Sequence, residues 1–131
     1  MTDRQISHVP LLDAVSADQS SDSFTCFDPD TRLLTIAYRL DSTTADLAGT
    51  LTISGGAEPD PATHSPLVGA AVFPAALSGA TLSNGVVTFA TVGTGARYSM
   101  IRIADPPPYV SVAYDYTSGG GTNRLRVKAV Y

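Results

Sequence analysis

Three stretches of this chain place an apolar or aromatic residue at every second position, and this period of two constrains the fold more than any other feature. The clearest stretch lies at 32–40, and similar alternations run through 110–116 and 124–131. In the first stretch the alternating positions are Leu34, Ile36, Tyr38 and Leu40. Side chains of a β-strand point to opposite faces in turn, so the pattern indicates strands with one buried face.

Turn residues divide much of the rest of the chain into short segments of the same kind. Asn84-Gly85 predicts a tight hairpin, because both residues tolerate positive φ. Further strands are expected at 23–27, 49–53, 68–73, 86–91 and 97–103. A short glycine-rich loop separates the last two strands, 110–116 and 124–131, so we expect them to pair as an antiparallel hairpin.

The choice of charged residues argues against helices. Glu58 is the only glutamate and Lys128 the only lysine, whereas the chain holds 11 Gly and 9 Pro. Glutamate and lysine are typical of exposed helix faces. We therefore predict an all-β fold: an antiparallel β-sandwich of about eight short strands, either jelly-roll-like or immunoglobulin-like.

The 131 residues fit one domain, which is large enough to bury a core without disulfides or metals. We expect a β-sandwich domain at 11–131 and an N-terminal arm at 1–10, because Pro10 interrupts regular structure. Such an arm either frays or lies on a neighbouring subunit. In the second case the contacts would come from Arg4, Ile6, His8 and Val9.

Several classes of partner lack their signatures in this sequence. The net charge is −4 and no clustered basic footprint is obvious, so nucleic-acid binding is not expected. No apolar run approaches the roughly 18 residues of a membrane span, and the first residues do not resemble a signal peptide. Cys26 is the only cysteine, so no intrachain disulfide can form, as expected of a protein folded in a reducing cytosol.

Residues for catalysis and metal binding are equally sparse. His8, His64 and Cys26 are widely spaced and too few for a typical zinc site. No Gly-x-Ser-x-Gly elbow is present, and Cys26 alternates with Phe24 as a core residue would. We therefore predict no catalytic residue, no metal and no cofactor; an enzyme of unusual type is the least favoured alternative.

Arg124, Arg126 and Lys128 share one face of the last expected strand and form the only basic stripe. The stripe is either a structural feature (a solvated sheet face or a charged edge that blocks aggregation) or a contact with an acidic partner surface. The sequence leaves both interpretations open.

The last third of the chain also carries a series of motifs at Arg97–Ile103, Pro106–Tyr114 and Thr117–Thr122. The segment Leu47–Gly55, in the middle of the chain, belongs to the same series. These segments resemble small virion proteins of tailed bacteriophages, in which a Tyr-Val-Arg-Val strand, a Thr-Ser-Gly turn and a Val-rich strand close a β-sandwich. The usual Gly-Ser-Asn-Asp-Gly step after the middle strand is replaced by Ser54–Asp60.

The resemblance implies a structural virion protein without catalytic residues. It would be a capsid decoration (cement) protein on the outside of a phage head, made in the host bacterial cytoplasm. It would bind the major capsid protein, bridge capsid subunits and form a homo-oligomer, a trimer. The alternative is a carbohydrate- or receptor-binding module of a phage tail, neck or fibre, using the loop at 55–66 and exposed tyrosines.

Overall fold

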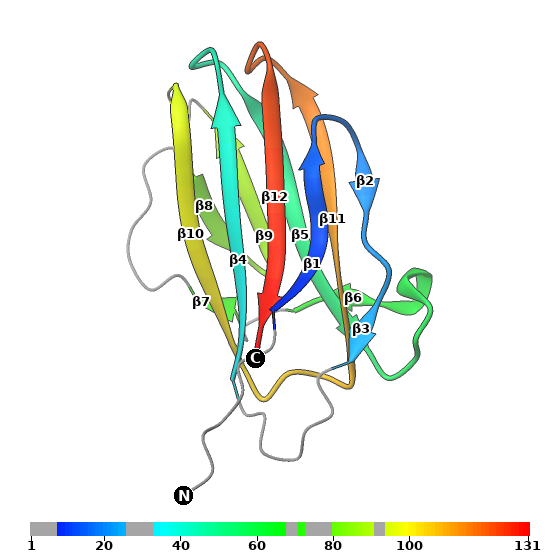
Figure 1. Ribbon diagram of the computed structural model, residues 1–131. Helices are drawn as coiled ribbons and strands as arrows, with labels where there is room; N and C mark the ends of the chain where they lie inside the picture. The colour runs from blue at the N-terminus through cyan, green and yellow to red at the C-terminus, as the bar shows by residue number, and fades with distance from the viewer. Residues whose placement is uncertain (1–7, 26–32, 68–70, 73–79, 91–93) are drawn as a thin grey trace, which may run out of the picture.

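The computed structural model describes residues 8–25, 33–67, 71–72, 80–90 and 94–131, which form two β-sheets packed face to face (Figure 1). These residues contain twelve strands and one 3-10 turn, so the predicted all-β, antiparallel sandwich is confirmed. The strands are β1 His8–Val15, β2 Gln19–Ser20, β3 Phe24–Thr25, β4 Leu33–Ser42, β5 Ala48–Gly56, β6 Ser65–Pro66, β7 Ala71–Val72, β8 Ala80–Ser83, β9 Val86–Ala90, β10 Gly95–Ala104, β11 Tyr109–Ser118 and β12 Asn123–Val130.

The strand order distinguishes between the two predicted kinds of sandwich. Sheet A has the order β1-β12-β4-β10-β7, and sheet B has the order β2-β11-β5-β9-β8. The short strands β3 and β6 pair with β11 and β5. Without β3, β6, β7 and β8, eight principal strands remain, and the chain changes sheet at every step except from β5 to β9. This is the double Greek-key order of a jelly roll, and it differs from the order of an immunoglobulin domain.

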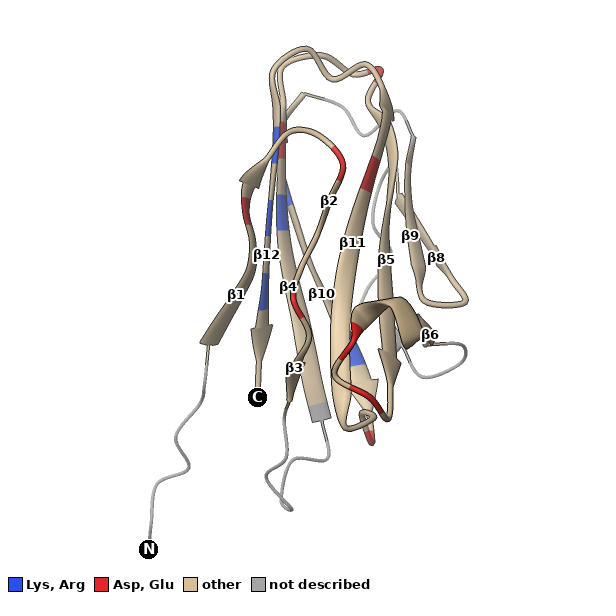
Figure 2. Ribbon diagram, turned by 90° about the vertical axis from the view of Figure 1, so that its right-hand side faces the viewer, with Lys and Arg blue, Asp and Glu red and all other residues tan. Residues whose placement is uncertain are grey.

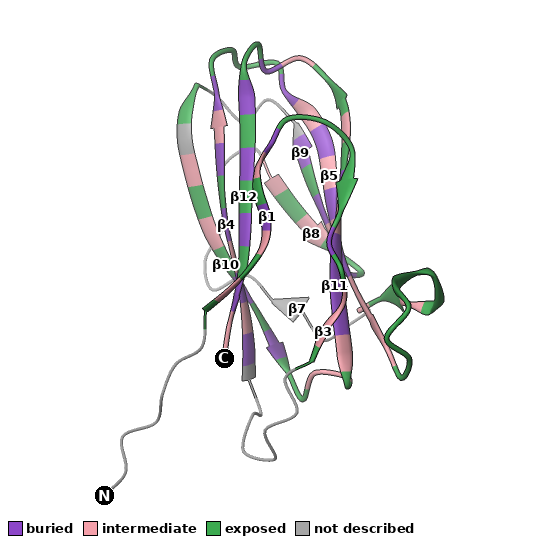
Figure 3. Ribbon diagram, turned by 45° about the vertical axis from the view of Figure 1, so that its right-hand side comes forward, coloured by how far each residue is buried: buried purple, intermediate pink, exposed green. Residues whose placement is uncertain are grey.

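The core consists of the apolar faces that the sequence predicted. On β4, β11 and β12 the alternating apolar residues are buried, and exposed residues lie between those of β12 (Figure 3). The buried members are Leu34, Ile36, Tyr38, Leu40, Val110, Val112, Tyr114, Leu125, Val127 and Ala129. The Asn84-Gly85 hairpin is also confirmed: it joins β8 to β9, with φ of 51° at Asn84 and 78° at Gly85.

The predicted hairpin between the last two strands is wrong. β11 pairs with β5 in sheet B, whereas β12 pairs with β1 and β4 in sheet A. A hairpin would place both apolar faces in one sheet, but here they face each other across the core. The connection is therefore an arch, and its glycines Gly119, Gly120 and Gly121 all have positive φ.

Hydrogen bonds hold this arch against the turn that follows β4. The Asp46 carboxylate accepts a hydrogen bond from the Gly120 N–H at 2.9 Å. The Gly120 carbonyl accepts from the Thr43 N–H at 3.0 Å and from the Ser42 hydroxyl at 3.1 Å. The hydrogen bond from the Thr44 hydroxyl and, after it, the one from Gly120 lower the pKa of Asp46.

Replacing Gly119 in the arch tests how tightly it is packed. A Cβ at Gly119 would lie 2.2 Å from the Asp46 carbonyl oxygen, in addition to the strain of its φ of 75°. We expect Gly119→Ala to lower the free energy of unfolding by more than about 2 kcal/mol in urea denaturation. Gly95 is the matched control, because its φ is 90° but nothing lies within 4 Å of its Cβ position. Gly95→Ala should cost only about 1–2 kcal/mol, and equal losses would contradict the packing argument.

The N-terminal strand revises the boundary of the expected arm. His8, Val9 and Pro10 belong to β1 and pair with the end of β12. Pro10 fits there because β1 is an edge strand, in which a missing N–H is tolerated. Pro10 is therefore part of the sandwich and does not mark its boundary; residues 1–7 lie outside the described residues.

The loop after β5 is shorter than the sequence suggested. β5 continues to Gly56 and pairs with β6, so the segment from 54 to 56 is strand. Between them, 57–64 contains a 3-10 turn at Pro61–Thr63, capped by the Asp60 carboxylate. Of the strand expected at 68–73, β7 is described, while the Cys26 region lies outside the described residues.

Two buried tyrosines in the core differ in how their hydroxyls are satisfied. The Tyr114 hydroxyl donates to Asn123 Oδ1 at 3.3 Å, whereas among the described residues the Tyr38 hydroxyl finds no hydrogen-bond partner of ordinary geometry. Burial raises the pKa of both to about 12, and for Tyr38 the Ser99 side chain offsets this only in part. Tyr38 instead packs its ring edge-on against Phe89, with centroids 5.6 Å apart.

The two hydroxyls should therefore respond oppositely to removal. Tyr38→Phe is expected to raise the free energy of unfolding by about 1 kcal/mol, because a buried hydroxyl that lacks a well-formed hydrogen bond is costly. Tyr114→Phe should lower it by about 1 kcal/mol, because the buried Asn123 loses its donor. Thermal and urea unfolding of the two variants measure this difference. A Tyr38→Phe variant as unstable as Tyr114→Phe would mean that the Tyr38 hydroxyl is satisfied.

Candidate functional site

The outward side of sheet A gathers most of the positive charge of the molecule. Figure 2 shows cationic positions on β12, β4 and β10. β12 contributes the three predicted cations, β4 contributes Arg39 and β10 contributes Arg102, and all five residues are exposed. Two exposed apolar side chains, Tyr98 and Met100, lie on the same side of β10. We call this surface the basic face; it consists of Arg39, Tyr98, Met100, Arg102, Arg124, Arg126 and Lys128.

Strand register aligns these residues in rows across β12, β4 and β10. Arg126 lies opposite Arg39, which lies opposite Tyr98. The next row is Lys128, Ala37 and Met100. The alternation of each strand and the pairing of three strands distant in sequence therefore bring cations and apolar groups onto one surface.

Ion pairs on the basic face centre on Asp41. Arg39 Nε lies 3.1 Å from Asp41 Oδ2, and Arg126 Nη1 lies 3.6 Å from the same oxygen. Arg126 Nε is also 3.8 Å from Asp13 Oδ1 on β1. Arg39 stacks on the Tyr98 ring at 5.7 Å from its centroid. Because the Arg39 and Arg126 side chains are 49% and 47% exposed, these pairs contribute little to stability.

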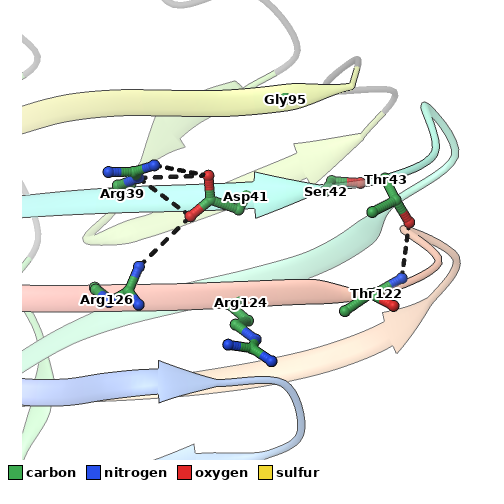
Figure 4. A pocket seen from close by; sticks show the side chains of 8 residues that line it. All are labelled: Arg39, Asp41, Ser42, Thr43, Gly95, Thr122, Arg124 and Arg126. Carbon is green, nitrogen blue, oxygen red and sulfur yellow. Dashed lines mark hydrogen bonds and ion pairs between the residues drawn. The ribbon is translucent and has the colours of Figure 1, made fainter.

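An open pocket of about 390 Å³ lies at one end of the basic face (Figure 4). Its lining residues come from β4, β10, β12 and the adjoining turns: Arg39, Asp41, Ser42, Thr43, Gly95, Thr122, Arg124 and Arg126. Arg124 is paired in register with Asp41, yet its guanidinium points away from that carboxylate. The described residues provide no ion-pair partner for Arg124.

The charge of the described residues is strongly segregated. Among the described residues, five of six cations lie on the basic face, and the sixth is Arg97. With Asp41 and Asp13 beside them, five cations and two acids leave that surface at +3, although the whole chain carries −4. The other described acids lie on sheet B and in the loops: Asp18, Asp22, Asp46, Glu58, Asp60, Asp105 and Asp115.

The residues expected to form an interface fall into three groups. Arg124, Arg126 and Lys128 lie together on the basic face. His8 is exposed opposite Val130, at the other end of β12 from the pocket, whereas Val9 packs against the core. Arg4 and Ile6 lie outside the described residues.

The sequence prediction missed Arg39, Tyr98, Met100 and Arg102. Their signal was present, because each lies on a predicted strand on the face opposite its buried residues, such as Leu40 on β4 and Ile101 and Ile103 on β10. What was lacking was the pairing of β4 with both β10 and β12, which no local pattern specifies.

A second polar cluster lies on the outer side of sheet B, where His64 contacts Ser111. His64 Nε2 is 2.8 Å from the Glu58 carbonyl oxygen, and Nδ1 is 2.8 Å from Ser111 Oγ. A carbonyl only accepts, so in the neutral ring Nε2–H donates to Glu58 and Nδ1 accepts from Ser111. Unlike the acid of a Ser-His-Asp triad, Glu58 contributes its backbone here, and Ser111 is only 5% exposed. The pair is best described as a latch for the loop at 57–64.

Removing the Ser111 hydroxyl tests the latch. We expect Ser111→Ala to lower the free energy of unfolding by about 1 kcal/mol and to speed amide exchange in the loop at 57–64. Exchange in β5 should not change. Ser54→Ala is a suitable control, because Ser54 is the cross-strand neighbour of Ser111 but is not bonded to His64. Unchanged exchange in the loop of Ser111→Ala would contradict the latch.

Within the described ranges, no group of three or more His, Cys, Asp or Glu side chains is placed to hold a metal ion. The same residues contain no helix long and apolar enough to cross a membrane. No protein family, no curated protein and no solved structure matches this chain.

Proposed function

We propose that this protein is a structural binding protein that docks through its basic face onto an acidic surface of a phage capsid. The observation that carries the proposal is the concentration of cations around exposed apolar groups on one face of a chain with net charge −4. The resemblance of the C-terminal third to small phage virion proteins supports the choice of the major capsid protein as partner.

The composition of the basic face is that of a docking surface. Tyr98 and Met100 are 65% and 47% exposed, and they are the large exposed apolar side chains among the described residues. Arginine, tyrosine and methionine are enriched at protein interfaces, where arginine and tyrosine often dominate the binding energy. An acidic partner surface would complement the cations, speed association and fix orientation.

A decoration protein needs only modest affinity at each contact. Several copies, or one oligomer touching several capsid subunits, multiply weak contacts by avidity. A trimer bridging subunits would stabilise the shell in this way without any catalytic group.

The geometry gives less support to a carbohydrate- or receptor-binding module. Tyr98 lies on sheet A, whereas the loop at 57–64 is bonded to Ser111 of sheet B. The loop and the most exposed tyrosine therefore do not form one site, and a glycan would have to bind one of them alone.

Charge removal on the basic face tests the docking proposal. We expect the double variant Arg102→Gln/Lys128→Gln to bind purified capsid shells about tenfold more weakly in co-sedimentation. Wild-type binding should also weaken as salt rises from about 0.05 M to 0.3 M, because exposed charges are screened.

The matched control is Ser83→Glu/Thr117→Glu, which changes the net charge equally but on exposed positions of sheet B. This control should bind shells like the wild type. Unchanged binding of the basic-face variant, or equal weakening of both variants, would overturn the proposal.

A further inference from the structure

We propose that the pocket at the end of the basic face is a carboxylate-binding site, in which Arg124 and Arg126 hold an acidic side chain of the partner protein. This inference rests on the proposed docking of the basic face and specifies its chemistry. In this proposal the pocket at one end of the basic face anchors the partner, and the remaining cations of that face guide its approach.

The pocket offers the donors that a carboxylate needs. Three arginines line it: Arg39 on β4, and Arg124 and Arg126 on β12. Gly95 forms the β10 side of the opening and adds no side chain (Figure 4). A guanidinium presents parallel N–H donors that match the two oxygens of a carboxylate.

The ion pairs within the molecule show that these arginines bind carboxylates. The Asp41 carboxylate lies between Arg39 and Arg126, within 3.1 and 3.6 Å of their nitrogens. Arg126 also reaches a second carboxylate, Asp13, at 3.8 Å. The three arginines and the two acids of the chain that contact them, Asp41 and Asp13, leave one positive charge in excess at the pocket. Arg124 is the arginine for which the described residues provide no ion pair.

The single excess positive charge at the pocket favours one acidic side chain over a polyanion. A nucleic acid brings closely spaced phosphates, each of which needs its own cation. Here Asp41 and Asp13 would flank such a strand, and the net charge of −4 would repel it. A single carboxylate would meet Arg124, which has no ion-pair partner among the described residues, without crowding Asp41 or Asp13.

Apolar contacts adjoin the site on the β10 side. Arg39 links the pocket to Tyr98 through its stacking contact, and Met100 follows in the next row. A partner residue anchored at Arg124 would therefore hold neighbouring apolar residues over Tyr98 and Met100. Burial of those groups would exclude water from the anchoring ion pair and strengthen it.

Arginine side-chain NMR with a capped peptide that carries a single glutamate tests the site directly. We expect the Nε–Hε signals of Arg124 and Arg126 to shift saturably, while the signal of Arg102 stays nearly unchanged. Arg124→Gln should weaken peptide binding about fivefold to tenfold, and Arg102→Gln, which removes an equal charge outside the pocket, less than about twofold. Equal shifts and equal weakening at Arg102 would overturn the pocket assignment.

Asp41→Asn gives a test that loss of folding cannot imitate. Without the internal carboxylate, Arg39 and Arg126 are released and the peptide should bind several-fold more tightly. Weaker or unchanged binding of a folded Asp41→Asn protein would overturn the inference.

Inorganic phosphate and a single-stranded DNA oligonucleotide are the competing probes. If either binds more tightly than the peptide and shifts the same arginine signals, the ligand of the pocket is a phosphate group and the carboxylate assignment is wrong.

Capsid shells separate this inference from the docking proposal. If Arg124→Gln weakens shell binding more than Arg102→Gln does, both stand. If the two variants weaken it equally, the pocket fails while docking through the basic face survives. If neither variant changes shell binding, both proposals fail.

Discussion

Burial of the apolar side of β12 is the constraint on which both the core and the basic face depend. Leu125, Val127 and Ala129 point inward, so the period of two forces the residues between them outward. A slip of one residue against β4 would bury the cations and expose the core residues, which fixes the register strongly. The register that stabilises the fold is thus also the one that aligns Arg126 with Arg39.

The basic face is tolerated by folding and is not required by it. Arg126 lies directly opposite Arg39, and like charges in that position destabilise a sheet. Asp41 and Asp13 offset the repulsion, but their ion pairs with Arg39 and Arg126 are half-exposed and contribute little to the free energy of folding. A solvated sheet face could equally be built from threonine and serine, as much of the outer face of sheet B is. Because the cations destabilise the sheet and their ion pairs add little stability, a binding role is the favoured explanation for them.

The sequence was informative about strands and poor about their partners. The alternations at 32–40 and 110–116 and the Asn84-Gly85 turn are local signals, and the structure confirms each of them. Pairing is non-local: adjacency in sequence suggested a β11–β12 hairpin, but burial of two apolar faces placed these strands in opposite sheets. The candidate site followed the same division. Its β12 stripe was visible in the sequence, whereas the contributions of Arg39 and Tyr98 depended on the register across β4 and β10.

The arch between the sheets links this topology to the pocket. Its Gly120 carbonyl accepts hydrogen bonds from the turn after β4, and the Thr122 N–H donates to Thr43 Oγ1 at 2.9 Å. These bonds tie together the ends of β4 and β12, where Asp41 and Arg124 are register partners. A site held by backbone bonds on two strands loses less conformational freedom when a partner binds than a site on a free loop does. The connection that lets the chain cross between sheets therefore also fixes the backbone on which the pocket arginines are placed.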